Sequence, residues 1–169
     1  MTVSSFHRRS VRLAALAATV TLFVSVPAVH ATGVSITASA IGSGLTTVDG
    51  ELRSFSFTAL EDESRDAKGM AVVNNRAIGE MFQLAIDCMN VFENMAIVSG
   101  VIIRHTDRYA IGLTGIFAVV DSGEGPEDPA DLITQVFFFR PDSLTCADVG
   151  PADAAPFLVP IEAGNVQVP

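Results

Sequence analysis

The stretch "SFSFTAL", Ser54–Leu60, decides the fold of this chain. Small polar residues alternate in it with three apolar ones, Phe55, Phe57 and Ala59. Successive side chains of a β-strand point to opposite faces of a sheet. The alternation therefore predicts a strand with one face against an apolar core and the other face in water.

The same period of two recurs along the chain and predicts about eight strands. We expect them at residues 33–42, 54–60, 69–75, 81–92, 95–105, 110–121, 131–140 and 164–168. Short polar links join the neighbours, including a tight turn at Asn94, so adjacent strands should run antiparallel as a meander. An open meander exposes its edges. The sequence thus predicts a single all-β domain that is closed into a small barrel or folded into a sandwich.

Glycines and a proline-rich segment modify this regular pattern. The glycines inside the expected strands are Gly100, Gly112 and Gly115. Glycine in a strand marks a bulge, a bend or the close approach of another backbone. Residues 141–150 favour one short helical turn, with Asp142 or Ser143 as its N-cap and Gly150 as its end. Residues 151–164 predict an extended, irregular return.

Three of the expected strands are apolar on both faces. They contain "IVSGVII" (97–103), "IFAVV" (116–120) and "VFFF" (136–139). A strand with one wet face should alternate, so the outer face of these strands needs a cover. We expect the proline-rich return to supply it. The alternatives are a protein partner, self-association, or a ligand.

The first 31 residues have the three parts of a secretory signal peptide. Arg8, Arg9 and Arg12 form a positive region, an apolar stretch of fewer than ~18 residues follows, and "VHA" ends at Ala31. We therefore expect cleavage after Ala31, secretion to the medium or the cell envelope, and a mature domain of residues 32–169. No integral membrane span is expected after cleavage.

The charge of the chain excludes some classes of binding partner. The formal net charge is −9, with 19 acidic and 10 basic residues, and the signal peptide holds three arginines but no acid. The mature domain is therefore more acidic still. Nucleic acid and anionic lipid need clustered lysine and arginine, so neither is an expected partner.

Two cysteines, Cys88 and Cys146, remain in the mature domain. In an exported protein an even pair favours a disulfide, with two buried thiols as the alternative. The closed loop would stabilise the fold by about 4 kcal/mol. A zinc site is disfavoured because His105 is the one histidine left and tetrahedral sites need three or four ligands.

Five carboxylates lie in the loop "DSGEGPEDPAD", residues 121–131. Oxygen ligands from Asp121, Glu124, Asp128 and Asp131 could hold calcium. The EF-hand pattern fails, because positions 3, 5 and 6 from Asp121 hold glycine, glycine and proline. We interpret the loop as a solvated connection, with a calcium site as the alternative.

No catalytic constellation is recognisable. Hydrolysis by a Ser-His-Asp set would need His105, with Asp107 close to it in sequence, but no G-x-S-x-G turn is present. A glycosidase pair of carboxylates lacks aromatic platforms, since the chain has no tryptophan and one tyrosine. We expect no catalytic residue and no cofactor.

Three segments carry a resemblance: "CMNVFENMAIVSGVI" (88–102), "FAVVDSGEG" (117–125) and "GNVQV" (164–168). They resemble a group of bacterial secreted all-β proteins without an assigned activity. That group has a cysteine-containing strand, a GN-x-A-x-V-S-G hairpin, a V-x-D-x-GEG loop and a terminal GN-[IV]-x-V. Here Glu93 replaces the hairpin glycine, and glutamate takes a positive φ less readily. The resemblance implies export and an all-β fold, and no catalytic residue.

Together these features predict an exported, non-enzymatic binding or structural module of the extracellular space or cell envelope. Three alternatives stay open: a calcium-dependent module that uses the 121–131 loop, a carrier of a small apolar ligand inside a barrel, and a hydrolase of unrecognised type.

Overall fold

The structure is a computed structural model that describes residues 35–125 and 127–169. The predicted signal peptide, residues 1–31, lies outside these ranges. The strands are β1 (Ile36–Val48), β2 (Glu51–Asp62), β3 (Ala67–Asn75), β4 (Glu80–Phe92), β5 (Met95–His105), β6 (Thr114–Val120), β7 (Leu132–Ile133), β8 (Phe137–Phe139), β9 (Val159–Pro160) and β10 (Ala163–Gln167).

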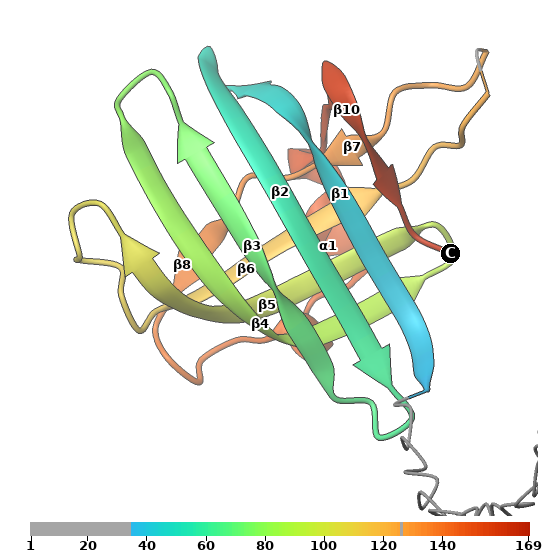
Figure 1. Ribbon diagram of the computed structural model, residues 1–169, viewed down its shortest axis with the longest axis horizontal. Coiled ribbons are helices and arrows are strands. Elements are labelled where there is room, and N and C mark those ends of the chain that lie inside the picture. Colours follow the sequence, from blue (N-terminus) through green and yellow to red (C-terminus); the bar gives the residue numbers. More distant parts are fainter. Residues whose placement is uncertain (1–34, 126) are drawn as a thin grey trace, which may run out of the picture. The chain divides into compact units, whose positions relative to one another are not determined.

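These strands form one antiparallel sheet that curls into a half-barrel (Figure 1). Their order is β10-β1-β2-β3-β4-β5-β6-β7-β9, and β8 pairs with β6. The all-β class and the antiparallel meander are confirmed. The sheet is single and curls into a half-barrel, so the architecture is neither the two-sheet sandwich nor the fully closed barrel that the sequence predicted. The C-terminal segment links the two edges at one end, because β9 pairs with β7 while β10 pairs with β1.

Ten strands replace the expected eight for two reasons. The stretch 131–140 forms β7 and β8 rather than one strand, and both pair with β6. Ile133 faces Val119 and Phe137 faces Ile116, so three residues oppose two, which is a β-bulge. The second reason is β9, a two-residue strand that the sequence pattern does not indicate.

Four turns between paired strands hold a non-glycine residue at positive φ: Asp49, Arg65, Glu93 and Arg108. β1 runs on to Val48, beyond its expected end, and the two-residue turn Asp49–Gly50 has φ of 53° and 80°. Asn94 lies in the β4–β5 turn as predicted, and Glu93 takes φ 54° beside it. Asn94 fixes this turn because its Nδ2 donates to the Asp121 carbonyl at 2.6 Å.

The inner face of the sheet carries the main core. Phe55, Phe57 and Ala59 are all buried there, as their alternation predicted. They pack in one cluster with residues from seven other strands, among them Leu84, Val98 and Phe117. Phe57 and Phe117 meet edge to face at 5.3 Å between ring centroids.

The protein's own C-terminal segment covers part of the outer face of β5 and β6. Ile97, Ile116 and Ala118 form a second cluster with Cys146 and Ala154. The expected cover is therefore confirmed for these residues, whereas Val101 and Ile103 of β5 remain exposed. Its form differs from the expectation, because it consists of 3-10 helix η1 (Cys146–Asp148), α-helix α1 (Pro151–Ala154) and 3-10 helix η2 (Ala155–Phe157) instead of an extended return.

Capping explains why this segment is helical. Thr145, not Asp142 or Ser143, is the N-cap of η1, and its hydroxyl accepts from the Ala147 amide at 3.3 Å. α1 starts with Pro151, whose φ suits a first helical position. The Cys88–Cys146 disulfide joins η1 to β4, with 5.8 Å between the Cα atoms. The predicted disulfide is thus present.

The three glycines that the sequence places inside strands are needed for different structural reasons. At Gly100 a Cβ atom would overlap the Ala85 carbonyl oxygen, so the backbones of β4 and β5 approach closely where their register shifts. At Gly115, in β6, a Cβ atom would crowd the Leu84 side chain. Gly112 is not in a strand but in the β5–β6 turn, at φ 88°.

Among the helices of the described ranges, none has the length and apolar character needed to cross a membrane.

Candidate functional site

A row of polar side chains crosses the inner face at one end of the sheet. Residues that pair across antiparallel strands share a face. Thr46 pairs with Arg53, Arg53 with Asn75, and Asn75 with Glu80, so β1 to β4 each contribute one member. The next inward row holds core residues and ends at His105 of β5. The polar row therefore forms the rim of the interior.

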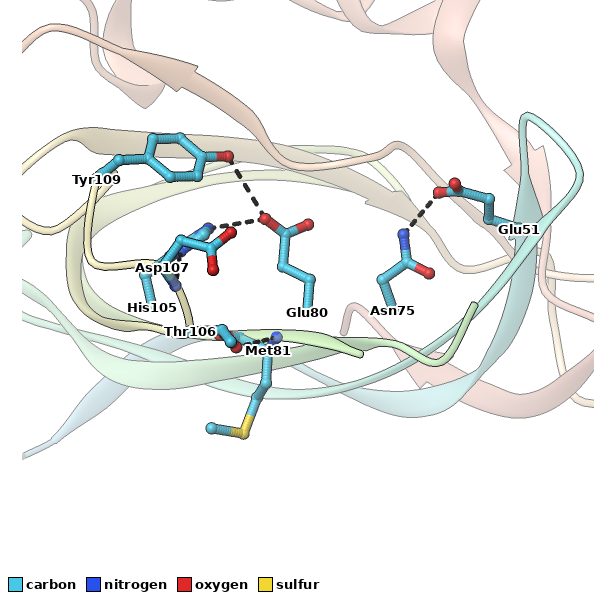
Figure 2. Close-up of polar contacts among 8 residues, drawn as sticks. All are labelled: Glu51, Asn75, Glu80, Met81, His105, Thr106, Asp107 and Tyr109. Atoms are coloured by element: carbon cyan, nitrogen blue, oxygen red, sulfur yellow. Dashed lines mark hydrogen bonds and ion pairs between the residues drawn. The ribbon is translucent and has the colours of Figure 1, made fainter. Parts of the chain in front are cut away.

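Glu51 anchors one half of this rim. Its Oε2 accepts from Asn75 Nδ2 at 2.6 Å and from Arg53 Nη2 at 3.3 Å, and Figure 2 shows the first of these bonds. The hydrogen bond from Asn75, followed by that from Arg53, lowers the pKa of Glu51. Glu51 therefore occupies one end of the Arg53 guanidinium. Arg53 Nε is buried and has no hydrogen-bond partner.

His105 anchors the other half. Its side chain is 0% exposed and packs against Phe82, Phe138 and Tyr109. Its Nδ1 accepts from the Asp107 backbone amide at 3.1 Å. A neutral imidazole that accepts at Nδ1 carries its proton on Nε2. Nε2 is thus a donor at the buried end of the ring.

Glu80 lies beside that donor. Glu80 Oε1 lies 3.0 Å from His105 Nε2, but the two atoms are not aligned as a hydrogen bond, and Nε2 stays without a partner. The same oxygen accepts from the Tyr109 hydroxyl at 3.4 Å (Figure 2). Burial, then the Glu80 charge, raises the pKa of Tyr109, so its phenol remains a donor. Both protein contacts converge on one oxygen of Glu80.

Glu80, His105 and Asp107 bring three potential metal-ligand atoms within 4.8 Å of one another, the one such group in the described part of the chain. The tautomer of His105 argues against a metal there. Nδ1 is taken by an amide and Nε2 carries a proton, so the ring has no free lone pair. The same arrangement deprives a Ser-His-Asp mechanism of its base, because Asp107 meets His105 through its main chain.

A cavity of about 90 Å³ lies inside the half-barrel below the rim. Its floor is apolar and includes the rings of Phe55, Phe57, Phe82, Phe117 and Phe138. Its rim includes Arg53, Glu80 and the half-buried Gln135. The two buried side-chain atoms without partners among the described residues, Arg53 Nε and His105 Nε2, both belong to this end of the molecule.

A second cavity, of about 260 Å³, lies on the other side of the sheet. It is lined by Ile116 and Ala118 of β6 and by Leu144, Ala154 and Phe157 of the C-terminal cover. Its lining is almost wholly apolar. Phe157, half exposed, packs edge to face on Phe137 at 5.0 Å.

The carboxylates of the 121–131 loop bind the free edge of β10. Asp131 is 7% exposed, and its two oxygens accept from the Ser122 amide at 2.8 Å and the Val166 amide at 2.7 Å. Asp121 accepts from the Val168 amide at 3.0 Å. One edge of β10 pairs with β1, so these acids satisfy amides on its other edge.

The remaining candidate cation ligands are also engaged. Glu124 accepts from Asn165 Nδ2 at 2.8 Å, and Asp128 accepts from the Gly125 amide at 2.6 Å. Within the described part of the loop, the carboxylates do not place three oxygens within 4.8 Å of one another. Figure 1 shows this loop, in orange, beside β10. The loop carboxylates therefore contact N–H donors.

Sequence reasoning missed the rim residues, although a signal for them exists. Arg53 precedes Phe55 by two positions, and Glu80 precedes Phe82 by two. Both charges are thus in phase with inward core residues, which is unusual for a charged side chain. The pairing of the strands, which brings these charges to one end, is not readable from that phase alone.

No family model matches the chain, and no curated protein or solved structure is similar to it. The function therefore has to be argued from the geometry of this chain.

Proposed function

We propose that this protein is an exported, non-enzymatic binding module whose ligand site is the inner cavity and its polar rim. The observation that carries the proposal is the unpaired, buried Nε of Arg53 beside a cavity with an apolar floor. A buried donor without a partner costs stability, about 1–3 kcal/mol for a typical group. Binding sites combine an apolar lining with a few such polar groups.

The rim supports binding better than catalysis. His105 has no free lone pair for a general base. Two of the hydroxyls that border the cavity are also engaged: Thr46 donates to the Pro160 carbonyl at 3.0 Å and Thr134 to the Gln135 carbonyl at 2.8 Å. An activated nucleophile needs an adjacent base, and both of these hydroxyls donate to main-chain carbonyls instead of to a base.

Export is part of the proposal and rests on the signal-peptide pattern of residues 1–31 and on the Cys88–Cys146 disulfide, a bond typical of oxidising compartments. The resemblance to bacterial secreted proteins supports the same location. Expression in a bacterium with fractionation tests it: the mature protein should leave the cytoplasm with Thr32 as its first residue. A cytoplasmic protein that retains Met1 would overturn this part.

Ligand binding at the rim is tested by NMR on the exported protein. A panel of small amphipathic molecules is titrated in, and amide shifts are followed. We expect shifts at Arg53, Ala71 and Val73, which line the cavity. Arg53→Gln should remove them. Arg104→Gln is the matched control, because Arg104 is exposed. A panel that shifts no cavity residue in the folded protein contradicts the proposal.

A second candidate function is a carrier of an apolar ligand, and the 260 Å³ cavity under the C-terminal cover favours it. The inner cavity, at about 90 Å³, is the smaller of the two and has no room for a long acyl chain. Ala154 lines the outer cavity, so Ala154→Leu should reduce binding of a fluorescent fatty acid. Ala152→Leu, at an exposed position of the same helix, should not. Equal binding by both variants would exclude this cavity.

A further inference from the structure

We infer that the rim takes a small zwitterion, an α-amino acid with a short aliphatic side chain, and this inference rests on the proposed function. It follows from the joining of one free cationic donor, one carboxylate and a small apolar cavity at a single rim. Each of the three features selects one part of such a molecule.

The charges at the rim call for a ligand with two charges of opposite sign. Arg53 and Glu80 both line the cavity. Arg53 gives Nη2 to Glu51 and keeps its buried Nε without a partner, while Glu80 carries a carboxylate. A ligand that is only an anion would meet Arg53 favourably and Glu80 unfavourably. A ligand that is only a cation would have the reverse problem. A neutral ligand would displace water from both charges without replacing their interactions.

The spacing suits charges that are carried on one carbon atom. Arg53 lies on β2 and Glu80 on β4, and Asn75 of β3 stands between them in the same row. Neighbouring strands are ~4.8 Å apart, so the two backbones are separated by about 10 Å. Side chains from both sides shorten this gap. A ligand whose ammonium and carboxylate share one carbon, with a hydrogen bond of ~2.9 Å to each partner, suits such a shortened gap.

The cavity limits the apolar part of the ligand. Its volume of about 90 Å³ compares with ~150 Å³ for a protein cavity that holds benzene. A group of three or four carbon atoms fits this space, which means an isopropyl or isobutyl group. An aromatic side chain or a long acyl chain is too large. Gln135, half-buried at the rim, can meet either polar group of the ligand through its amide.

Four molecules with the same branched chain test the inference. Valine has both charges, isovalerate lacks the ammonium group, isobutylamine lacks the carboxylate, and isobutanol has neither charge. Dissociation constants come from NMR titration of the exported protein. We expect valine to bind at least tenfold more tightly than the other three.

Two variants then assign the charges. In Arg53→Gln, valine should lose its advantage over isobutylamine, since nothing is left to recognise the carboxylate. In Glu80→Gln, valine should lose its advantage over isovalerate. Arg104→Gln should keep the order of the wild type. If one variant does not fold, the other still tests its own half of the site.

The outcomes separate this inference from the proposed function. Equal affinities for all four molecules, with shifts at Ala71 and Val73, would overturn the zwitterion and leave a binding cavity in place. A preference for isovalerate or isobutylamine would do the same. No shift with any of the four, or with the wider panel of amphipathic molecules, overturns both.

Discussion

Asp131 offers the sharpest test of how the C-terminal strand is held. Its carboxylate is buried and accepts from the amides of Ser122 and Val166, at 2.8 and 2.7 Å. Asp131→Asn keeps the shape of the side chain but replaces one acceptor oxygen by a donor NH₂ group. One of the two amides then faces a donor and loses its partner.

The size of the effect follows from these two bonds. A hydrogen bond to a charged group contributes about 1.5–3 kcal/mol, and a buried donor that is left alone costs about 1–3 kcal/mol. Asp131→Asn should therefore lower the free energy of unfolding by about 2–3 kcal/mol. In a domain of this size that loss lowers Tm by roughly 6–10 °C.

Urea unfolding and amide hydrogen exchange measure this loss. The urea midpoint should fall with an unchanged m-value, because the folded and unfolded states keep their exposed areas. At Val166 the exchange protection should fall by about 30-fold, which corresponds to about 2 kcal/mol. Protection of Leu84, in the centre of the sheet, reports the global loss and serves as the internal reference.

Glu127→Gln is the matched control. Glu127 lies in the same loop, is exposed, and accepts no hydrogen bond among the described residues. The Glu127→Gln substitution removes one negative charge, as Asp131→Asn does. If both variants change Tm equally, charge rather than the bond to β10 sets the effect, and the reasoning is refuted. A wild-type Tm that rises in millimolar calcium, and a rise that Asp131→Asn abolishes, would instead establish the calcium alternative.

Three further predictions follow from other contacts. Partial desolvation raises the pKa of Asp87 above its unfolded value, and because the side chain is exposed the effect is small. Its ionised form slightly destabilises the fold as pH rises through the folded pKa, so Asp87→Asn should raise Tm slightly at pH 7 and leave it unchanged below pH ~3.9, as thermal melts at both values will show. Removal of the disulfide by Cys88→Ala with Cys146→Ala should cost about 4 kcal/mol in urea unfolding and increase binding of a hydrophobic dye, because η1 is released from β4. Arg53→Met should keep or raise Tm while it removes ligand shifts at the rim, and a fall of Tm by more than 5 °C would show that Arg53 is structural.

The period-two pattern predicted most of the sheet because it records burial directly. β5 spans residues 95–105 as expected, and the alternation of residues 54–60 identifies the inward face of β2. Local patterns did not locate the division of 131–140 into β7 and β8. That division depends on a bulge against β6, a strand that is distant in sequence. Periodicity within one strand contains no information about the register with the next.

The acidic loop shows a second limit of sequence reasoning. Its composition fits equally well with solvation, with calcium and with what the structure contains, carboxylates that accept from β10. The deciding fact is that Val166 and Val168 lie beside Asp131 and Asp121, although they are 35 and 47 positions away. Such a contact is set by the curvature of the whole sheet. Charge density along the chain cannot indicate it.

The cost of the rim residues is itself an argument for a function. Arg53 and Glu80 stand at inward positions, where an apolar side chain would pack on the cavity and add stability. Arg53 instead keeps a buried donor unpaired, and His105 does the same three strands away in the sheet. Groups that lower stability in the folded protein alone are typical of sites where a ligand completes the missing interactions. By contrast, both carboxylate oxygens of Asp131 accept hydrogen bonds from the chain itself. The rim therefore has unpaired polar atoms that a ligand could bind, whereas Asp131 in the loop does not.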